Sequence, residues 1–161
     1  MIPLFITKSI PVMLNQEVRK IMTLNPATAS PEQSISEVSE YMLANNIQQM
    51  PVTNEGQLVG MITTYDMWKA IRKQQTENSL NVEQVMNDKV IKITPKDKVG
   101  TAAELFLDNR FKTLPVVNLR NELKGVITSF DLMRLAIKEE YPRPILYKDA
   151  FQSQEAAGSQ P

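Results

Sequence analysis

A seven-residue segment occurs twice in this chain, as GMITTYD from Gly60 to Asp66 and as GVITSFD from Gly125 to Asp131. The preceding residues recur as well, because VRKIM at 18–22 returns 64 residues later as VEQVM at 82–86. The second copy gains one residue in a polar stretch with the composition of a surface turn, where changes in length are tolerated. The chain therefore consists of two copies of one unit.

Both copies have the same predicted order of elements. Apolar stretches at 27–29 and 90–93 predict a first strand, and apolar residues at helical spacing follow over 35–42 and 99–106. Two β-rich runs joined by turn residues predict a hairpin, and a second helix follows each repeated aspartate. One such unit is only marginally stable alone, because its helices are too few to cover its sheet. We therefore expect an α/β (α+β) fold with two β-α-β-β-α motifs packed as a pseudo-twofold pair through their sheets.

Composition places the expected boundaries. Residues 1–15 form an N-terminal extension that either adds an edge strand or wraps the pair. The two units span 16–73 and 82–140, and the polar composition between them predicts a linker at 74–81. Residues 141–161 contain three prolines and end in QSQEAAGSQP, which predicts an extended and then disordered tail.

Composition also argues against several classes of function. The 18 basic and 18 acidic residues leave no net positive field for nucleic acid. The chain has no cysteine and no histidine, so an enzyme would depend on carboxylates, lysines and hydroxyls, and we expect no metal site. The apolar start is broken by Pro3, Lys8 and Pro11, well short of the roughly 20 apolar residues of a membrane helix. It also lacks an export signal, so we expect a cytoplasmic protein.

The repeated Thr-x-x-Asp has two interpretations. Thr63 with Asp66, and Thr128 with Asp131, have the spacing of a capping box, in which both side chains satisfy backbone donors at a helix start. The same strand-to-helix corner also suits a nucleotide, because a helix N-terminus attracts phosphate and an aspartate accepts hydrogen bonds from ribose. The glycine before each strand admits another backbone or a flat base.

The repeated pattern, MPVTNEGQLVGMITTYD and then LPVVNLRNELKGVITSFD, resembles a tandem pair of CBS motifs, the module named after cystathionine β-synthase and also called a Bateman module. The resemblance covers about residues 18–139. It implies a non-catalytic regulatory module that binds AMP, ADP or ATP in clefts between the motifs and signals to a separate partner protein, commonly as a homodimer. The alternatives are a sensor of S-adenosylmethionine or NAD, and a ligand-free interaction or dimerisation scaffold.

The resemblance also implies the site residues. It puts the ribose on Asp66 and Asp131, and a hydroxyl near the phosphate on Thr63 and Thr128. The adenine of each site lies against the other motif. For the Asp131 site, the implied neighbours are Val126, Pro26, Ala27, Thr28, Ile47, Met50 and Pro51. For the Asp66 site, they are Met61, Val90, Ile91, Phe111, Leu114 and Pro115. Core packing is an equal or better interpretation of Met50, Leu114 and the two strand prolines.

The two sites are expected to differ in charge. Lys112 and Thr113 stand where the first copy has Gln48 and Gln49. If each pair serves the aspartate of its own copy, the site of Asp131 has a cation for phosphate and the other site has only amides. A charge-assisted hydrogen bond contributes roughly 1.5–3 kcal/mol, against about 1 kcal/mol for a neutral one. We therefore expect the Asp131 site to bind phosphorylated adenosine more tightly.

Two large apolar side chains are candidate interface anchors. The apolar stripe of the helix after Asp66 leaves Trp68 to one side, and Met133 is its counterpart in the second copy. Tryptophan and methionine are enriched at protein interfaces, so we expect both residues to contribute to a homodimer. Packing against the tail is the alternative.

Overall fold

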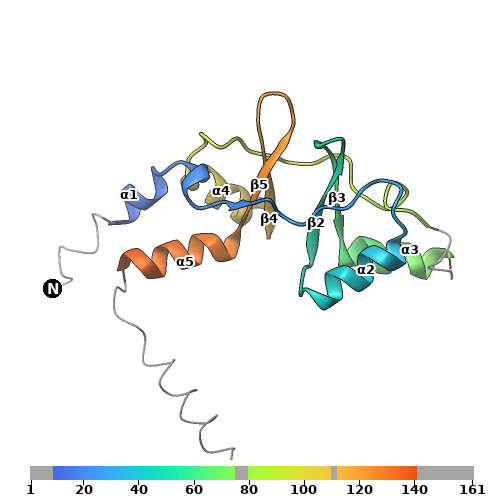
Figure 1. Cartoon of the computed structure of the whole chain (residues 1–161). Helices are drawn as coiled ribbons and strands as arrows, with labels where there is room; N and C mark the ends of the chain where they lie inside the picture. The colour runs from blue at the N-terminus through green and yellow to red at the C-terminus, as the bar shows by residue number, and fades with distance from the viewer. Residues whose placement is uncertain (1–8, 75–79, 110–111, 141–161) are drawn as a thin grey trace, which may run out of the picture.

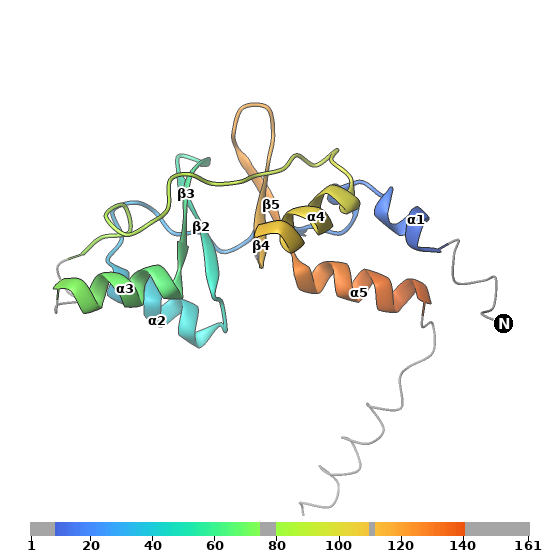
Figure 2. The same ribbon diagram turned by 180° about the vertical axis from the view of Figure 1, so that it is seen from behind.

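The computed structural model describes residues 9–74, 80–109 and 112–140. The expected tail, Phe111 and most of the linker lie outside these residues. Two hairpins stand side by side at the middle of the molecule, and helices flank them on either side (Figures 1 and 2). The elements are α1 (Ser9–Leu14), a 3-10 helix (Val18–Lys20), β1 (Thr23–Leu24), α2 (Ile35–Ala44), β2 (Gln49–Asn54), β3 (Gln57–Thr63), α3 (Thr64–Gln74), α4 (Val99–Asn109), β4 (Thr113–Val117), β5 (Leu123–Thr128) and α5 (Ser129–Glu140). The predicted α/β (α+β) class is confirmed.

The predicted hairpins form the centre of two lobes. Lobe 1 contains α2, β2, β3 and α3, and lobe 2 contains α4, β4, β5 and α5. Strand β2 pairs with β3 so that Pro51 faces Met61, and β4 pairs with β5 so that Pro115 faces Val126. The register shifts after Val52 and at the equivalent place in lobe 2, so the lobes share even this irregularity.

The prediction of a first strand at 27–29 and 90–93 is wrong. Only single parallel bridges form there, from Ala29 to Val52 and from Ile93 to Val116. A proline follows closely in each copy and lacks the N–H that a longer ladder needs, so pairing stops after one residue.

The strand that does form lies earlier and belongs to the opposite lobe. Strand β1 pairs antiparallel with β5, with Thr23 facing Val126. In the second copy, Asn87 makes the matching antiparallel bridge to Met61. Each motif therefore sends its leading segment across to the hairpin of the other motif.

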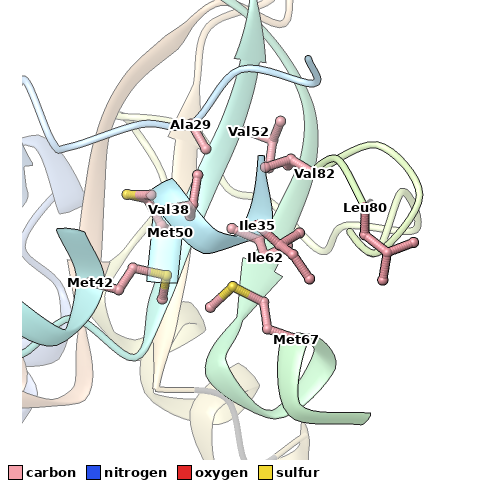
Figure 3. Close-up of a cluster of buried hydrophobic side chains, with 10 residues drawn as sticks. All are labelled: Ala29, Ile35, Val38, Met42, Met50, Val52, Ile62, Met67, Leu80 and Val82. Atoms are coloured by element: carbon pink, nitrogen blue, oxygen red, sulfur yellow. The ribbon is translucent and has the colours of Figure 1, made fainter. Parts of the chain in front are cut away.

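The two cores exchange residues in the same way. Val82, from the leading segment of the second copy, packs in the core of lobe 1 beside Ala29, Val52 and Ile62 (Figure 3). Val18, its counterpart, packs in the core of lobe 2. Both valines are fully buried, and burying such a side chain contributes roughly 1.5–3 kcal/mol. The exchange therefore connects the two lobes energetically.

The hairpin ends meet at the pseudo-twofold axis. Gln57 forms an antiparallel bridge with Glu122, and these two residues occupy equivalent positions in the two copies. The Leu58 N–H donates to the Asn121 carbonyl at 3.0 Å, and the Leu123 N–H donates to the Gly56 carbonyl, also at 3.0 Å. The predicted packing of the two motifs through their sheets is confirmed.

The N-terminal extension takes neither of its two predicted forms in the part that the structure describes. It forms α1, which packs against α4 and α5 of lobe 2. Within the described residues, none of the helices has the length and apolar character required to cross a bilayer.

Candidate functional site

The repeated Thr-x-x-Asp caps both helices, with the full reciprocal capping box in lobe 2 and the threonine half of it in lobe 1. At α5, the Thr128 N–H donates to Asp131 Oδ2 at 2.8 Å, and the Asp131 N–H donates to Thr128 Oγ1 at 3.2 Å. At α3, the Asp66 N–H donates to Thr63 Oγ1 at 3.0 Å. Each threonine hydroxyl also donates to Oδ2 of its aspartate, at 2.5 Å in lobe 1 and 2.7 Å in lobe 2. The capping interpretation is confirmed, and it occupies one carboxylate oxygen of each aspartate.

The repeated glycines accommodate the crossing backbone. A Cβ atom at Gly125 would lie 2.5 Å from the Thr23 carbonyl oxygen. A Cβ atom at Gly60 would lie 2.5 Å from Met86 Sδ and 3.2 Å from the Asn87 carbonyl oxygen. Of the two predicted reasons for glycine, close approach of another backbone is the one that these contacts support.

A cleft of about 730 Å³ opens beside the start of α5, and we call it the Thr128 cleft. It brings together nine of the predicted residues: Pro26, Ala27, Ile47, Gln48, Pro51, Lys112, Thr113, Val126 and Thr128. Its volume falls in the range of roughly 300–1,000 Å³ that is typical of small-molecule sites. Sequence reasoning did not assign the remaining lining residues to it: Thr23, Asn46, Gln49, Ser129, Phe130 and Met133.

The equivalent cleft beside the start of α3, the Thr63 cleft, is much smaller at about 140 Å³. It brings together the predicted residues Met61, Thr63, Asp66, Val90, Ile91, Leu114 and Pro115, with Gln49, Asn87, Lys89 and Thr113. Phe111 was also predicted here but lies outside the described residues. The two clefts therefore differ in size although they are built from equivalent segments.

Three predicted residues do not line the Thr128 cleft. Met50 is 2% exposed and belongs to the core of lobe 1, as its alternative interpretation held. Thr28 is exposed but is not part of the cleft wall. Asp131 is also absent from the wall, because its side chain is 10% exposed, is engaged in the helix cap and lies 3.8 Å from the Arg134 guanidinium.

The assumption that each polar pair serves the aspartate of its own copy is wrong. Gln48 lines the Thr128 cleft opposite Lys112, whose Nζ donates to Gln48 Oε1 at 3.2 Å. Gln49 and Thr113 line both clefts. Lys112 supplies a cation to the Thr128 cleft as predicted.

The Thr63 cleft contains a cation that sequence reasoning missed. Lys89 lines this cleft from the crossing segment, beside Val90. The expectation that only amides serve the Asp66 site is therefore wrong. The repeat could have indicated Lys89 as a site residue. Its equivalent in the first copy, Asn25, directly precedes the predicted site residue Pro26.

The two candidate anchors lie on the surface. Trp68 is 53% exposed and Met133 is 50% exposed, whereas the neighbouring Met67 is buried. The Trp68 ring stacks on Tyr65 with centroids 5.9 Å apart, and the Arg72 guanidinium lies 5.1 Å from the Trp68 ring. Trp68 also borders a groove of about 470 Å³ between α2 and α3. The predicted position of Trp68 off the buried stripe is confirmed.

The sequence model of the CBS domain family matches residues 18–72 and 82–138. The chain belongs to the CBS domain family. Both matched segments lie within the two predicted motifs, so the tandem CBS pair is confirmed. MJ1225 from Methanocaldococcus jannaschii is 30% identical over 131 residues, which are 74% of this chain and 47% of that protein. The chain thus spans about half the length of this relative, and it covers 22% to 25% of relatives that carry enzyme names.

Solved structures of CBS pairs have the same fold. The CBS pair of MJ0100, in complex with 5′-methylthioadenosine and S-adenosylmethionine, superposes on this chain with a TM-score of 0.68 and 28% sequence identity. The match covers 78% of this chain and 98% of that one. CBSX2 from Arabidopsis thaliana, in complex with AMP, also has a TM-score of 0.68, with 23% identity over 76% of this chain and 96% of that one.

Proposed function

We propose that this CBS pair is a non-catalytic regulatory module that binds an adenine nucleotide and signals its occupancy to a separate protein. The observation that carries the proposal is the Thr128 cleft, whose lining combines apolar side chains with a cation and hydroxyl groups. Pro26, Ala27 and Pro51 supply apolar surface, and Lys112 supplies the positive charge beside the start of α5. Apolar walls suit a base, and a lysine near a helix N-terminus suits phosphate.

The Thr128 cleft is the tighter site for AMP, ADP or ATP in this proposal. Its volume is suited to a nucleotide, whereas the Thr63 cleft is below the usual range for a small-molecule site. In the Thr63 cleft, Asp66 reaches the wall and offers a ribose its remaining carboxylate oxygen. Because Asp131 does not line the Thr128 cleft, its role as a ribose ligand requires the side chain to turn.

The choice of ligand within the adenosine class rests on charge. MJ0100 was solved with S-adenosylmethionine and 5′-methylthioadenosine, and CBSX2 was solved with AMP, so adenosine is common to both relatives. Lys112 favours a phosphorylated ligand over S-adenosylmethionine, which carries a positive sulfonium. NAD remains compatible because it is also phosphorylated.

The chain's own residues support a role without catalysis. It contains no histidine or cysteine, and the two repeated aspartates are engaged in helix caps. We also propose that the module forms a homodimer through Trp68 and Met133. An adenine-nucleotide sensor operates where these nucleotides are abundant, so the proposal puts the protein in the cytoplasm.

A thermal-shift panel with AMP, ADP, ATP, S-adenosylmethionine and NAD tests this function. Ligand at 100 times its dissociation constant should stabilise the fold by roughly 2.7 kcal/mol. The panel is run on the native chain, Lys112→Gln, Asp66→Ala and Asp131→Ala, and the ligand-induced shift is compared because each aspartate variant also loses a cap. Asp97→Ala is the matched control, since Asp97 accepts a hydrogen bond from the Thr94 N–H but lines neither cleft.

We expect a shift with an adenine nucleotide that decreases in Lys112→Gln and persists in Asp97→Ala. A shift that is the same in Lys112→Gln and the native chain would contradict the assignment of the phosphate end. The absence of a shift with every ligand would leave the chain as an interaction scaffold.

A further inference from the structure

Two cavities of this molecule share a wall. Asn46, Ile47 and Gln48 line the Thr128 cleft, and the same three residues line the groove of about 470 Å³ that Trp68 borders. We call residues 46–48 the shared wall and this second cavity the Trp68 groove. A ligand that fills the Thr128 cleft therefore contacts a segment that also forms part of the surface around Trp68.

Backbone hydrogen bonds tie the shared wall to both helices that bound the Trp68 groove. The Ile47 N–H donates to the Met42 carbonyl in the last turn of α2 at 2.8 Å, and the Gln48 carbonyl accepts from the Thr64 N–H at the start of α3 at 3.1 Å. Helices α2 and α3 pack side by side, and the groove lies between them (Figures 1 and 2). A displacement of the wall would therefore move one end of each helix, because closely packed segments transmit strain.

A side chain of the opposite lobe holds the shared wall from the cleft side. Lys112 Nζ donates to Gln48 Oε1 at 3.2 Å, and both residues of this Lys112–Gln48 pair line the Thr128 cleft. Lys112 is also the cation to which the proposed nucleotide brings its phosphate. A charge-assisted bond from lysine to phosphate is shorter and stronger than a bond to a neutral amide. A phosphate in the cleft would therefore draw the ammonium group away from Gln48.

We propose that a phosphorylated ligand in the Thr128 cleft changes the Trp68 groove through the shared wall. This inference rests on the proposed nucleotide function and adds its output. The phosphate takes Lys112 from Gln48, the released wall shifts, and the end of α2 and the start of α3 shift with it. Trp68 lies about one turn of α3 beyond Thr64, so the change reaches the surface of the proposed homodimer contact.

The sole tryptophan allows this inference to be tested on the full chain. AMP is titrated while Trp68 fluorescence, excited where adenine does not absorb, and its quenching by acrylamide are recorded. Calorimetry under the same conditions measures binding. We expect the emission maximum and the quenching constant to change with the same dissociation constant as the heat signal. AMP binding by calorimetry with unchanged Trp68 signals would overturn the inference and leave the proposed function intact. Failure of AMP, ADP and ATP to bind would overturn both.

Gln48→Ala tests whether the wall is the route. It removes the side chain that Lys112 holds but keeps the backbone hydrogen bonds to α2 and α3. The variants are compared at saturating AMP, so that altered affinity does not enter. Gln48→Ala should lose most of the Trp68 change, and Gln84→Ala should keep it. Gln84 is a suitable control because it is exposed, bonded through its own amide to the Asn81 N–H, and lines neither cavity. A full Trp68 change in Gln48→Ala would exclude the wall.

Two other sources of a Trp68 signal are separable from this route. AMP bound in the Trp68 groove itself would keep its affinity in Lys112→Gln, whereas binding in the Thr128 cleft should weaken by about tenfold or more. A change in assembly would make the size of the fluorescence change depend on protein concentration, whereas transmission within one chain is independent of it. Unchanged affinity in Lys112→Gln, or dependence on protein concentration, would overturn the inference.

Discussion

Gly125 and Gly60 are equivalent in sequence, but an added methyl group would meet different atoms. At Gly125 the obstacle is the Thr23 carbonyl oxygen at 2.5 Å, a backbone atom held in the β1–β5 ladder. At Gly60 the nearest obstacle is the end of the flexible Met86 side chain, and the Asn87 carbonyl is 3.2 Å away. The first obstacle cannot move without breaking a strand pair, whereas the second can rotate.

We predict that Gly125→Ala lowers the free energy of unfolding by about 2–3 kcal/mol, the upper part of the range for overpacking, and that Gly60→Ala costs less. Urea denaturation of both variants measures the difference. Gly100→Ala is the control, because the nearest atom to its added Cβ would be the Leu14 carbonyl oxygen at 3.4 Å and alanine favours the helix. A smaller loss at Gly125 than at Gly60 would contradict the crossing-strand explanation.

For single residues, the sequence predicted contacts within one helical turn correctly. It did not predict which cleft a side chain faces. The Thr-x-x-Asp spacing predicted the caps because all partners lie within one helical turn. Lys89 and Gln48 were misjudged because their placement depends on how segments from different copies meet. No local pattern states which cleft a side chain faces.

Among the elements, α3 carries the most prominent exposed aromatic surface. Its outer face carries a stack of side chains, in which Trp68 lies against Tyr65 and Arg72 lies over Trp68. On its inner face, Met67 packs in the core of lobe 1. We predict that Trp68→Glu reduces the molecular mass measured by light scattering from that of a dimer to that of a monomer, because the glutamate would place a charge in the apolar contact. The fold should be retained within about 0.5 kcal/mol, as for other exposed sites.

Leu119→Glu is the control for this variant, since Leu119 is fully exposed at the β4–β5 turn and has no assigned contact role. An unchanged mass for Trp68→Glu, or an equal loss in Leu119→Glu, would remove Trp68 from the interface.

The hairpins and long helices were predictable because their periodicity extends over five or more residues. Strand β1 was not, because it is two residues long and both residues are exposed, so neither alternation nor burial marks it. Its existence depends on a partner strand far along the chain. Pairing of that kind is visible only once the two copies are placed together.

For the whole molecule, the exchange of Val18 and Val82 predicts one cooperative unfolding transition. Leu114 is buried in lobe 2, so Leu114→Ala should cost about 2–5 kcal/mol. The sole tryptophan, Trp68, lies in lobe 1 and reports on that lobe by fluorescence. We predict that in Leu114→Ala the urea midpoint of the Trp68 fluorescence transition decreases by the same amount as the midpoint of the circular dichroism transition. Separate midpoints for the two signals would show that the lobes unfold independently.

The crossing of the leading segments also has an evolutionary consequence. Two separate copies of a single motif could exchange the same segments, and such a symmetric ancestor would carry one residue type at both positions of the Lys112–Gln48 pair. Joining the copies in one gene allows each position to mutate alone. The hydrogen bond from lysine to glutamine is therefore a mark of divergence between the two copies, because a symmetric pair would carry the same residue on both sides.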